Sequence, residues 1–290
     1  MKILAIGDFQ GKYPTKLKRR LVKEDFDLIV VVGDITGLDD WKPYTIDLFK
    51  RIKRGNNRIS PEEFFGKKKF KDLEKRDFES GKMVLHNLNS LGKPVMLIFG
   101  NSDDGWYDHP VHKLINPTRS AKVFMKKLRN IKDITYSNKV FNGFNFVGHG
   151  GYMDIEAYFR KNTFKSEKEY VPIKIKRHKA VKKKFFKLLK KANKQKKPLA
   201  FVLHYPPYGV FDKIRDKNNP MDGYSAGVKF FREGIKKYKP KIVFCGHMHE
   251  YQGMKGLYGV PVVNPGDAGL GKYAIVDIQD NERMNFKFIK

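Results

Sequence analysis

The sequence predicts an α/β protein whose sheets are partly parallel and carry helices on their outer faces. Short apolar runs rich in β-branched and aromatic residues recur along the chain, and such runs are typical of strands covered on both faces. Stretches with helical spacing lie between several of these runs, so strand and helix alternate. The sequence has neither a Gly/Ser/Pro-rich linker nor an internal repeat. We therefore expect a single domain spanning residues 1–290.

Apolar runs that end in polar residues are the candidate strands. They are residues 3–6 before Gly7-Asp8, 28–32 before Gly33-Asp34, 94–99 before Gly100-Asn101, 144–147 before Gly148-His149, 198–203 before His204, and 241–245 before Gly246-His247-Met248-His249. Ligands of such sheets bind beyond the carboxyl ends of the strands. One aspartate at a strand end is commonly a turn residue, but six polar strand ends together indicate a shared site.

The candidate helices lie between these strands. Residues 14–24 and 226–238 have helical spacing, and Ser60-Pro61-Glu62-Glu63 has the pattern of a capping box that opens a helix running toward Leu91. Residues 174–197 contain 13 Lys or Arg and no acidic residue, with apolar residues at helical spacing. We expect an amphipathic helix there, with Phe185 in the core and a lysine-rich outer face.

The chain is strongly basic, with 60 Lys and Arg against 31 Asp and Glu and a formal net charge of +29. Such a surface attracts polyanions, so nucleic acid is a candidate partner. A charged fraction of 31% is also typical of proteins from hot environments. The single Cys245 excludes an internal disulfide, and no apolar stretch approaches the roughly 18 residues of a membrane helix. We expect a cytoplasmic protein with no membrane partner; the oligomeric state stays open.

The residue types at the strand ends favour a metal site. Carboxylate, amide and imidazole ligands without thiolate suit Mn, Fe, Zn, Ni or Co ions. A carboxylate can bridge two ions about 3.5–4 Å apart, the arrangement used for in-line displacement at phosphorus. His247 and His249 are two residues apart, so we expect their rings to leave an extended backbone on the same side.

These residues resemble the motifs of a known family. Asp8-x-Gln10, Gly33-Asp34, Gly100-Asn101-x-Asp103, His204 and Gly246-His247-x-His249 are similar to the five motifs of the calcineurin-like metallophosphoesterase superfamily. Residues 204–209, 244–250 and 262–278 resemble its Icc-like predicted phosphoesterase subgroup. The resemblance covers nearly the whole chain apart from charged helical insertions at about 39–82 and 153–197. It implies an α/β fold of the α+β type, a four-layer sandwich of two mixed β-sheets flanked by helices.

The resemblance also implies an activity and its ligands. The chain would be a phosphodiesterase or phosphatase, and a hydroxide activated by two divalent metal ions would attack the phosphate ester in line. Asp8, Asp34 and His249 would hold one ion, and Asp34 would bridge to a second ion held by Asn101, His204 and His247. Manganese is the first expectation, with iron, nickel, zinc, cobalt or magnesium as alternatives.

Two positions depart from the family pattern. Gln10 stands where the family usually has histidine, and its amide oxygen is a weaker ligand, so the first metal site is expected to be looser. Ser102 stands where many relatives carry a histidine that protonates the leaving group. Together with Asp34 and Asn101, the catalytic candidates are therefore Asp103 and His149, either of which, or water, would supply that proton. Diesters and activated esters would then be favoured.

Other functions fit parts of the sequence. A nuclease fits the basic surface, and a non-catalytic scaffold fits a metal site weakened at Gln10. Residues 266–272 have the spacing of a phosphate-binding P-loop, but Tyr273 stands where that motif needs Ser or Thr and a strand pattern follows. We expect a turn there instead, with Asn264 near the substrate.

Overall fold

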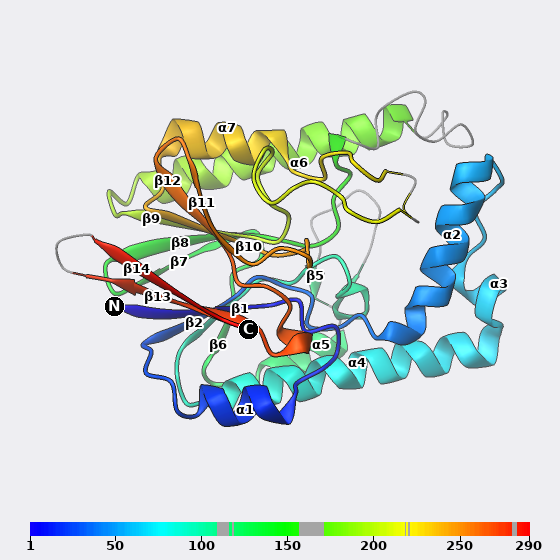
Figure 1. The fold of residues 1–290 in the computed structure, drawn as a ribbon, viewed down its shortest axis with the longest axis horizontal. Helices are drawn as coiled ribbons and strands as arrows, with labels where there is room; N and C mark the ends of the chain where they lie inside the picture. The colour runs from blue at the N-terminus through cyan, green and yellow to red at the C-terminus, as the bar shows by residue number, and fades with distance from the viewer. Residues whose placement is uncertain (109–115, 118, 157–170, 218, 220, 280–282) are drawn as a thin grey trace.

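The computed structural model describes residues 1–108, 116–117, 119–156, 171–217, 219, 221–279 and 283–290. Two six-stranded mixed sheets face each other, and helices cover both outer faces (Figure 1). This arrangement confirms the predicted fold class.

The first sheet combines four parallel strands with an antiparallel edge. Its order is β14 (Met284–Ile289), β13 (Tyr273–Ile278), β1 (Lys2–Ile6), β2 (Leu28–Val31), β3 (Val95–Leu97) and β6 (Ile131–Asp133). Strands β1, β2, β3 and β6 are parallel, whereas β13 is antiparallel to both β1 and β14. Strand β13 therefore completes the sheet from a distant part of the sequence.

The second sheet has parallel inner strands and an antiparallel partner at each edge. Its order is β11 (Gly253–Leu257), β12 (Val260–Asn264), β10 (Ile242–Cys245), β9 (Leu199–Leu203), β8 (Phe144–His149) and β7 (Asn138–Phe141). Strands β12, β10, β9 and β8 are parallel. Consequently the carboxyl ends of the inner strands share one edge. A separate ribbon pairs β4 (Tyr107–Asp108) with β5 (Asn116–Pro117), after the short helix η2 (Asp104–Trp106).

Alternation of buried side chains divides the core into three layers. Ile3, Ala5, Phe146 and Val202 belong to the layer between the sheets. Helices α1 (Thr15–Leu21), α4 (Lys67–Asn89) and α5 (Arg119–Met125) contribute buried residues to the layer outside the first sheet. Helices α6 (Val171–Asn193) and α7 (Lys229–Tyr238) cover the second sheet, and Phe185 is buried there as expected. Every inner strand is thus covered on both faces.

The insertion at 39–82 forms a helical arm beside the sandwich. It comprises η1 (Asp39–Trp41), α2 (Lys42–Arg54), α3 (Pro61–Phe65) and most of α4, and α2 and α3 stand off the body near one end of α4 (Figure 1). Ser60 and Glu63 form the predicted capping box. The single helix expected from there to Leu91 is wrong, because Gly66 adopts a φ of 78° that ends α3 and restarts the chain as α4.

Most of the insertion at 153–197 is helix α6, while its residues 157–170 lie outside the described residues. Cys245 is buried in β10. Within the described part of the chain, each helix is too short or too polar to cross a lipid bilayer.

Candidate metal centre

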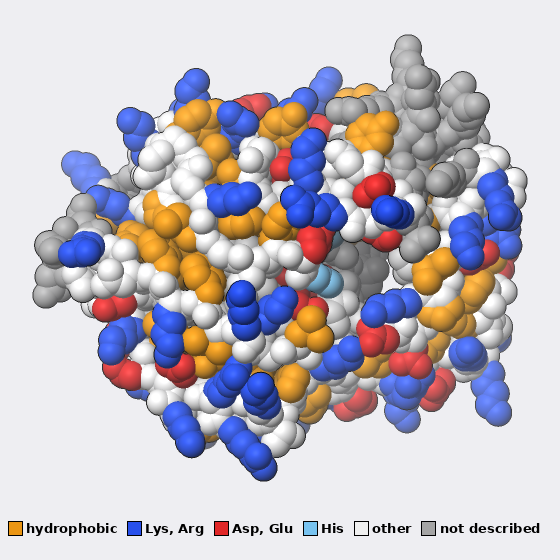
Figure 2. All heavy atoms as spheres, viewed as in Figure 1, with side chains coloured by type: hydrophobic (Ala, Val, Ile, Leu, Met, Phe, Trp, Pro, Cys, Tyr) orange, Lys and Arg blue, Asp and Glu red, His pale blue; other side chains and the backbone are white. Residues whose placement is uncertain are grey.

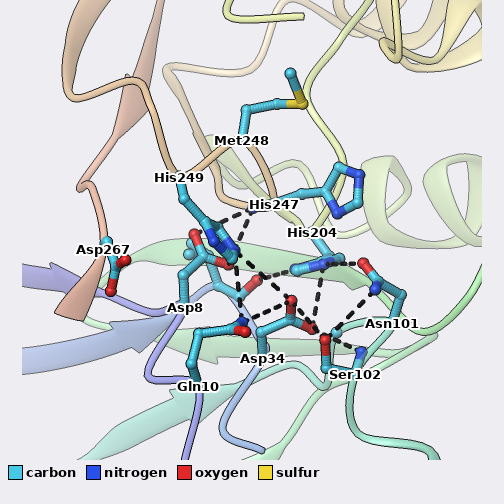
Figure 3. A network of polar contacts seen from close by, with 12 residues as sticks. Asp8, Gln10, Asp34, Asn101, Ser102, His204, His247, Met248, His249 and Asp267 are labelled. Carbon is cyan, nitrogen blue, oxygen red and sulfur yellow. Dashed lines mark hydrogen bonds and ion pairs between the residues drawn. The ribbon is translucent and has the colours of Figure 1, made fainter. Parts of the chain in front are cut away.

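The polar strand ends of both sheets converge at one place. Asp8, Asp34 and Asn101 follow β1, β2 and β3 of the first sheet, whereas His204 follows β9 and His247 and His249 follow β10 of the second. These residues form one network between the facing edges, which His247 joins through its backbone N–H (Figure 3). The space-filling view shows a hollow between the body and the helical arm, with a histidine side chain visible at its margin (Figure 2).

Two groups of potential metal ligands share Asp34. One group contains Asp34, His204 and His247, and the other contains Asp8, Asp34 and His249. Within each group the ligand atoms all lie within 4.8 Å of one another. A carboxylate offers two oxygens, so Asp34 can contribute to both groups at once. The donor chemistry of both groups fits a divalent cation of the borderline kind.

The Asp34 carboxylate is held in a defined orientation. The backbone N–H of Ser102 donates to Oδ1 at 2.9 Å, and the Ser102 hydroxyl donates to Oδ2 at 3.1 Å. His204 Nε2 lies 3.4 Å from Oδ1, and His249 Nε2 lies 4.0 Å from Oδ2. Each oxygen therefore faces a different imidazole, as a bridging carboxylate requires.

His204 is oriented through its other ring nitrogen. Its Nδ1 lies 2.8 Å from the carbonyl oxygen of Val32, which accepts only if Nδ1 carries the proton. This bond leaves the Nε2 lone pair facing the cluster, 2.8 Å from Asn101 Oδ1. Two electron-pair donors that face each other are stabilised by a shared cation. A hydrogen bond from the second ring nitrogen to a carbonyl oxygen is typical of metal-ligating histidines.

Asp8 is completely buried and faces the backbone of the loop that carries His247 and His249. The His247 N–H donates to both carboxylate oxygens, at 3.0 and 3.1 Å. Burial raises the pKa of Asp8 to about 6; His249 and His204 oppose this shift and Asp34 adds to it. Burial favours the neutral form of Asp8, and a cation bound beside it would favour the ionised form instead.

His247 and His249 belong to different groups. The expectation that an extended backbone directs both rings to one side is wrong, because His247 has a φ of 69°. Asp8, Gln10 and Asp34 also have left-handed backbone, with φ between 50° and 55°. Such conformations are costly for residues with side chains and concentrate at functional sites.

The two histidines differ in their titration. Burial lowers the pKa of His247 well below its usual value, and the nearby His204 and His249 lower it further. The His249 ring, 3.6 Å from Asp8 Oδ1, is subject to the same effect of burial. The carboxylates of Asp8, Asp34, Asp267 and Glu250 together outweigh it and raise the pKa of His249. His247 is thereby kept in the neutral form that can bind a metal.

Gln10 lies at the edge of the group formed by Asp8, Asp34 and His249. Its Nε2 is 3.4 Å from Asp34 Oδ2 and 3.5 Å from His249 Nε2. The side-chain amide is thus in reach of the position that a fourth ligand would occupy.

Asp103 is close to the cluster but already fully engaged. Its Oδ1 accepts from the backbone N–H and the hydroxyl of Thr36, and its Oδ2 accepts from the Gly100 N–H at 2.6 Å. Burial and the Asp34 charge raise its pKa to about 8. Through its hydrogen bonds to Thr36, Asp103 ties the loop after β2 to the loop after β3. This placement favours a positioning role over the proton donation expected from the sequence.

The structure does not bring His149 into the cluster. Its ring lies on the opposite face of the second sheet, in contact with Phe185, Phe230 and Phe231, and its exposed fraction is 1%. In the parallel pairing His149 stands opposite Leu203, so the residue that follows β9, His204, points the other way. The proton-donor role considered for His149 finds no support in this position.

One supporting residue was missed from the sequence, and another lies elsewhere than expected. Asp77 on α4 accepts from the N–H groups of Gly37 and Leu38, both at 2.9 Å, and so anchors the loop after Asp34 to the helical arm. Asn264, expected near the substrate, is buried and donates to the Met248 carbonyl. Asn264 was placed there because it adjoins the expected turn at 266–272; nothing in the sequence marked Asp77.

The turn at 266–272 is as expected. Asp267 caps the short helix η5 (Ala268–Leu270), and strand β13 follows at Tyr273. These residues form no P-loop, because a P-loop leads into a helix.

Comparison with known proteins identifies the family. The family model described as "Metallophosphoesterase, calcineurin superfamily" matches residues 1–287. The chain belongs to this superfamily. It is accordingly a metal-dependent phosphoesterase, a hydrolase.

Solved structures with the same fold agree with the family assignment. A dimetal phosphatase from Danio rerio shares 11% identity with a TM-score of 0.54 over 99% of this chain and 95% of that one. A protein of Thermus thermophilus shares 14% identity with a TM-score of 0.53 over 99% and 97%. Phosphopantetheinyl hydrolase from Mycobacterium tuberculosis shares 12% identity with a TM-score of 0.50 over 91% and 88%. No curated protein sequence matches the chain.

Proposed function

We propose that this metallophosphoesterase holds two divalent cations through a shared Asp34 and hydrolyses phosphodiesters or activated phosphomonoesters. The observation that carries the proposal is the position of Asp34, whose carboxylate belongs to both ligand groups. The Danio rerio structure, a dimetal phosphatase by name, is consistent with two ions.

The ligand sets follow from the two groups. Asp8, Asp34 and His249 would hold the first cation, with Gln10 as a weak additional ligand. Asp34, His204 and His247 would hold the second, joined by Asn101 through its carbonyl oxygen, which lies beside His204 Nε2. Oxygen and imidazole donors of this kind favour manganese as the resident metal, with iron, nickel, zinc, cobalt and magnesium as alternatives.

Bound cations would polarise the phosphoryl oxygens and make hydroxide available at neutral pH for in-line attack. The protein's own residues supply orientation. Ser102 fixes Asp34 through two hydrogen bonds, Val32 fixes the tautomer of His204, and Asp103 fixes the loops that carry Asp34 and Asn101. Positioning of this kind is what lowers the barrier once the ions are present.

The substrate preference follows from the group at position 102. The Ser102 hydroxyl donates its hydrogen bond to Asp34, so it is a poor proton donor to a leaving oxygen. Without an imidazole at position 102, no side chain there protonates the leaving oxygen. Diesters and monoesters whose leaving groups have a low pKa are therefore hydrolysed faster than alkyl monoesters.

The proposal is tested by metal analysis and a substrate screen. We expect close to two ions per chain in protein loaded with Mn, and hydrolysis of bis-p-nitrophenyl phosphate that depends on the added metal. Asp34→Asn should lower kcat/KM by a factor of at least about 10³, because both sites lose a ligand. Asp277→Asn, on β13 and outside both groups, is the matched control and should change little. One ion or none, with an inert protein, would refute the proposal and favour a scaffold.

A nuclease is the second candidate, favoured by the net charge of +29. Each phosphate contact releases counterions, so a nuclease should bind single- or double-stranded DNA or RNA with a steep salt dependence. Cleavage of such strands more efficient than that of small diesters would favour this candidate. A cytoplasmic location, proposed from the single cysteine, fits either substrate class.

A further inference from the structure

A cavity of about 600 Å³ lies between α6 and the end of β8, separate from the metal centre. Its rim consists of lysines from α6 and the residue just beyond it: Lys184, Lys187, Lys190, Lys191 and Lys194. All five side chains are exposed. Their spacing of three or four residues places them as neighbours on one side of the helix.

The rim carries positive charge that no carboxylate balances in the part of the chain that the structure describes. Among the described residues, no carboxylate lies within ion-pair distance of these five lysines, whereas Lys182 on the same helix pairs with Glu233 at 2.6 Å. Like charges at three- and four-residue spacing destabilise a helix. A ligand with several negative charges would therefore be complementary to the rim.

The floor of the cavity contains a buried polar group that has no hydrogen-bond partner in the described part of the chain. His149 borders the cavity, is 1% exposed, and has no hydrogen bond at either ring nitrogen among the described residues. Buried polar atoms without partners are rare in folded proteins. The neighbouring Tyr136 hydroxyl donates to the Gly150 carbonyl and so cannot serve His149. A ligand acceptor seated in the cavity could accept the His149 N–H.

The remaining floor is apolar. Phe185 is buried and Leu188 is half-buried, and both border the cavity. Asn145 on β8 donates to the Ala192 carbonyl of α6 at 3.0 Å, which fixes the helix against the sheet beside the cavity. The cavity thus joins an apolar floor, one buried donor and a cationic rim.

We propose that this cavity binds a small organic polyphosphate, namely a nucleoside di- or triphosphate. The phosphates would contact the lysine rim, and the base would lie on the apolar floor beside the His149 N–H. A volume of about 600 Å³ exceeds what a phosphate chain alone needs and falls in the usual range for small-molecule sites, about 300–1,000 Å³. A nucleic-acid strand would need several exposed aromatic rings in succession, whereas the cavity offers a single apolar floor bordered by Phe185, Leu188 and Tyr136.

The site is independent of the metal chemistry. His149 and the cluster are joined through the backbone, where the His204 N–H donates to the His149 carbonyl at 3.0 Å, and the two rings face opposite sides of the sheet. Binding at the cavity should therefore survive loss of the bridging carboxylate at Asp34.

Calorimetric titration of the full-length, Mn-loaded protein with β,γ-methylene-ATP tests the proposal. The parent protein and Asp34→Asn should both bind with a dissociation constant in the micromolar range. The double variant Lys187→Glu/Lys191→Glu should weaken binding at least tenfold, and His149→Leu about threefold or more. Lys179→Glu/Lys183→Glu is the matched control, since it makes the same charge change on the same helix outside the cavity, and should alter binding less than twofold.

The outcomes separate this site from the alternatives. Absence of saturable binding to either protein at millimolar nucleotide overturns the proposal, and so does equal weakening by the two lysine pairs. Loss of binding in Asp34→Asn alone would place the nucleotide at the metal centre instead. Tripolyphosphate binding as tight as nucleotide binding would overturn the role of the floor, and preferential binding of a single-stranded oligonucleotide would replace the nucleotide with nucleic acid. Thermal unfolding of each variant verifies that it is folded.

Discussion

Gly100 packs directly against the Asp34 carboxylate, with no space for a side chain between them. A Cβ on Gly100 would overlap Asp34 Oδ1 and would lie 2.6 Å from Cε1 of His204. The glycine thus allows the loop after β3 to approach Asp34, which both ligand groups share, and its neighbour His204.

We expect Gly100→Ala to damage the centre while a similar change elsewhere does not. Displacement of Asp34 and His204 should lower kcat/KM at least about 100-fold and destabilise the fold by about 2–3 kcal/mol, because close backbone neighbours cannot move freely. Gly256→Ala, in edge strand β11 with nothing within 4 Å of the added Cβ, is the control. Activity and unfolding midpoints that are the same for both variants would contradict this reading of the contact.

Gln10→His should tighten the site formed by Asp8, Asp34 and His249. The Gln10 amide already lies 3.5 Å from His249 Nε2, and imidazole is a better ligand than a neutral amide for the metals expected here. We expect metal affinity at one of the two sites to rise about tenfold or more, measured by titration with a competing chelator. Unchanged affinity together with an unchanged rate would mean that Gln10 is not a ligand.

Metal affinity should fall steeply in mild acid. Burial raises the pKa of Asp8 to about 6, so below that pH a cation must displace a proton from this carboxylate. Acid has the opposite effect on the folding stability of the metal-free protein. The folded state holds the Asp8 proton more tightly than the unfolded state, so this group's contribution to stability is largest at low pH and declines as the pH rises toward 6. Chelator titrations between about pH 5 and pH 8 measure the first effect, and unfolding curves of the metal-free protein from about pH 4 to pH 7 measure the second.

Removal of the metal should also lower the unfolding temperature at neutral pH. Bound ions stabilise the folded state by about 4 kcal/mol when their concentration is 1,000 times the dissociation constant. The effect should be absent in Asp34→Asn, which retains the fold but lacks the shared ligand. An equal loss in both proteins on chelation would indicate that the chelated ion sits elsewhere.

His149→Leu should make the protein less sensitive to acid. Burial lowers the pKa of His149 to about 3, whereas in the unfolded chain the ring titrates near 6.5. Below pH 6.5 only the unfolded state takes up the proton, so stability is lost as the pH falls. Between pH 7 and pH 5 this loss is about 2 kcal/mol. Denaturant unfolding of parent and variant at both pH values isolates it, and identical pH slopes would show that His149 is protonated in the folded state.

The strand ends were predictable because the signal is local. An apolar run followed by Asp or His, directly or after one glycine, marks both the strand and the residue it delivers. Asp8, Asp34 and His204 all lie where this pattern placed them. The orientation of His149 was not predictable in the same way. It too ends a strand, but which face of a sheet it occupies depends on the register with β9, a property of the folded sheet.

Local backbone geometry limited the other predictions. Spacing suggested one direction for the rings of His247 and His249, but the positive φ of His247 separates them. A capping box at Ser60 correctly marked a helix start, whereas Gly66 ended that helix after one turn. The support that Asp77 gives to the loop after Asp34 is a contact between distant segments and has no sequence signature.

The pairing of β1 with β13 bears on how the protein is made. Strand β1 carries the chain directly into Asp8, yet one of its two hydrogen-bonding edges is satisfied only by residues 273–278. While the ribosome is still adding the second sheet, that edge is open to wrong partners. A polypeptide halted before residue 273 should therefore aggregate or recruit a chaperone, even though every predicted cation ligand has already been synthesised.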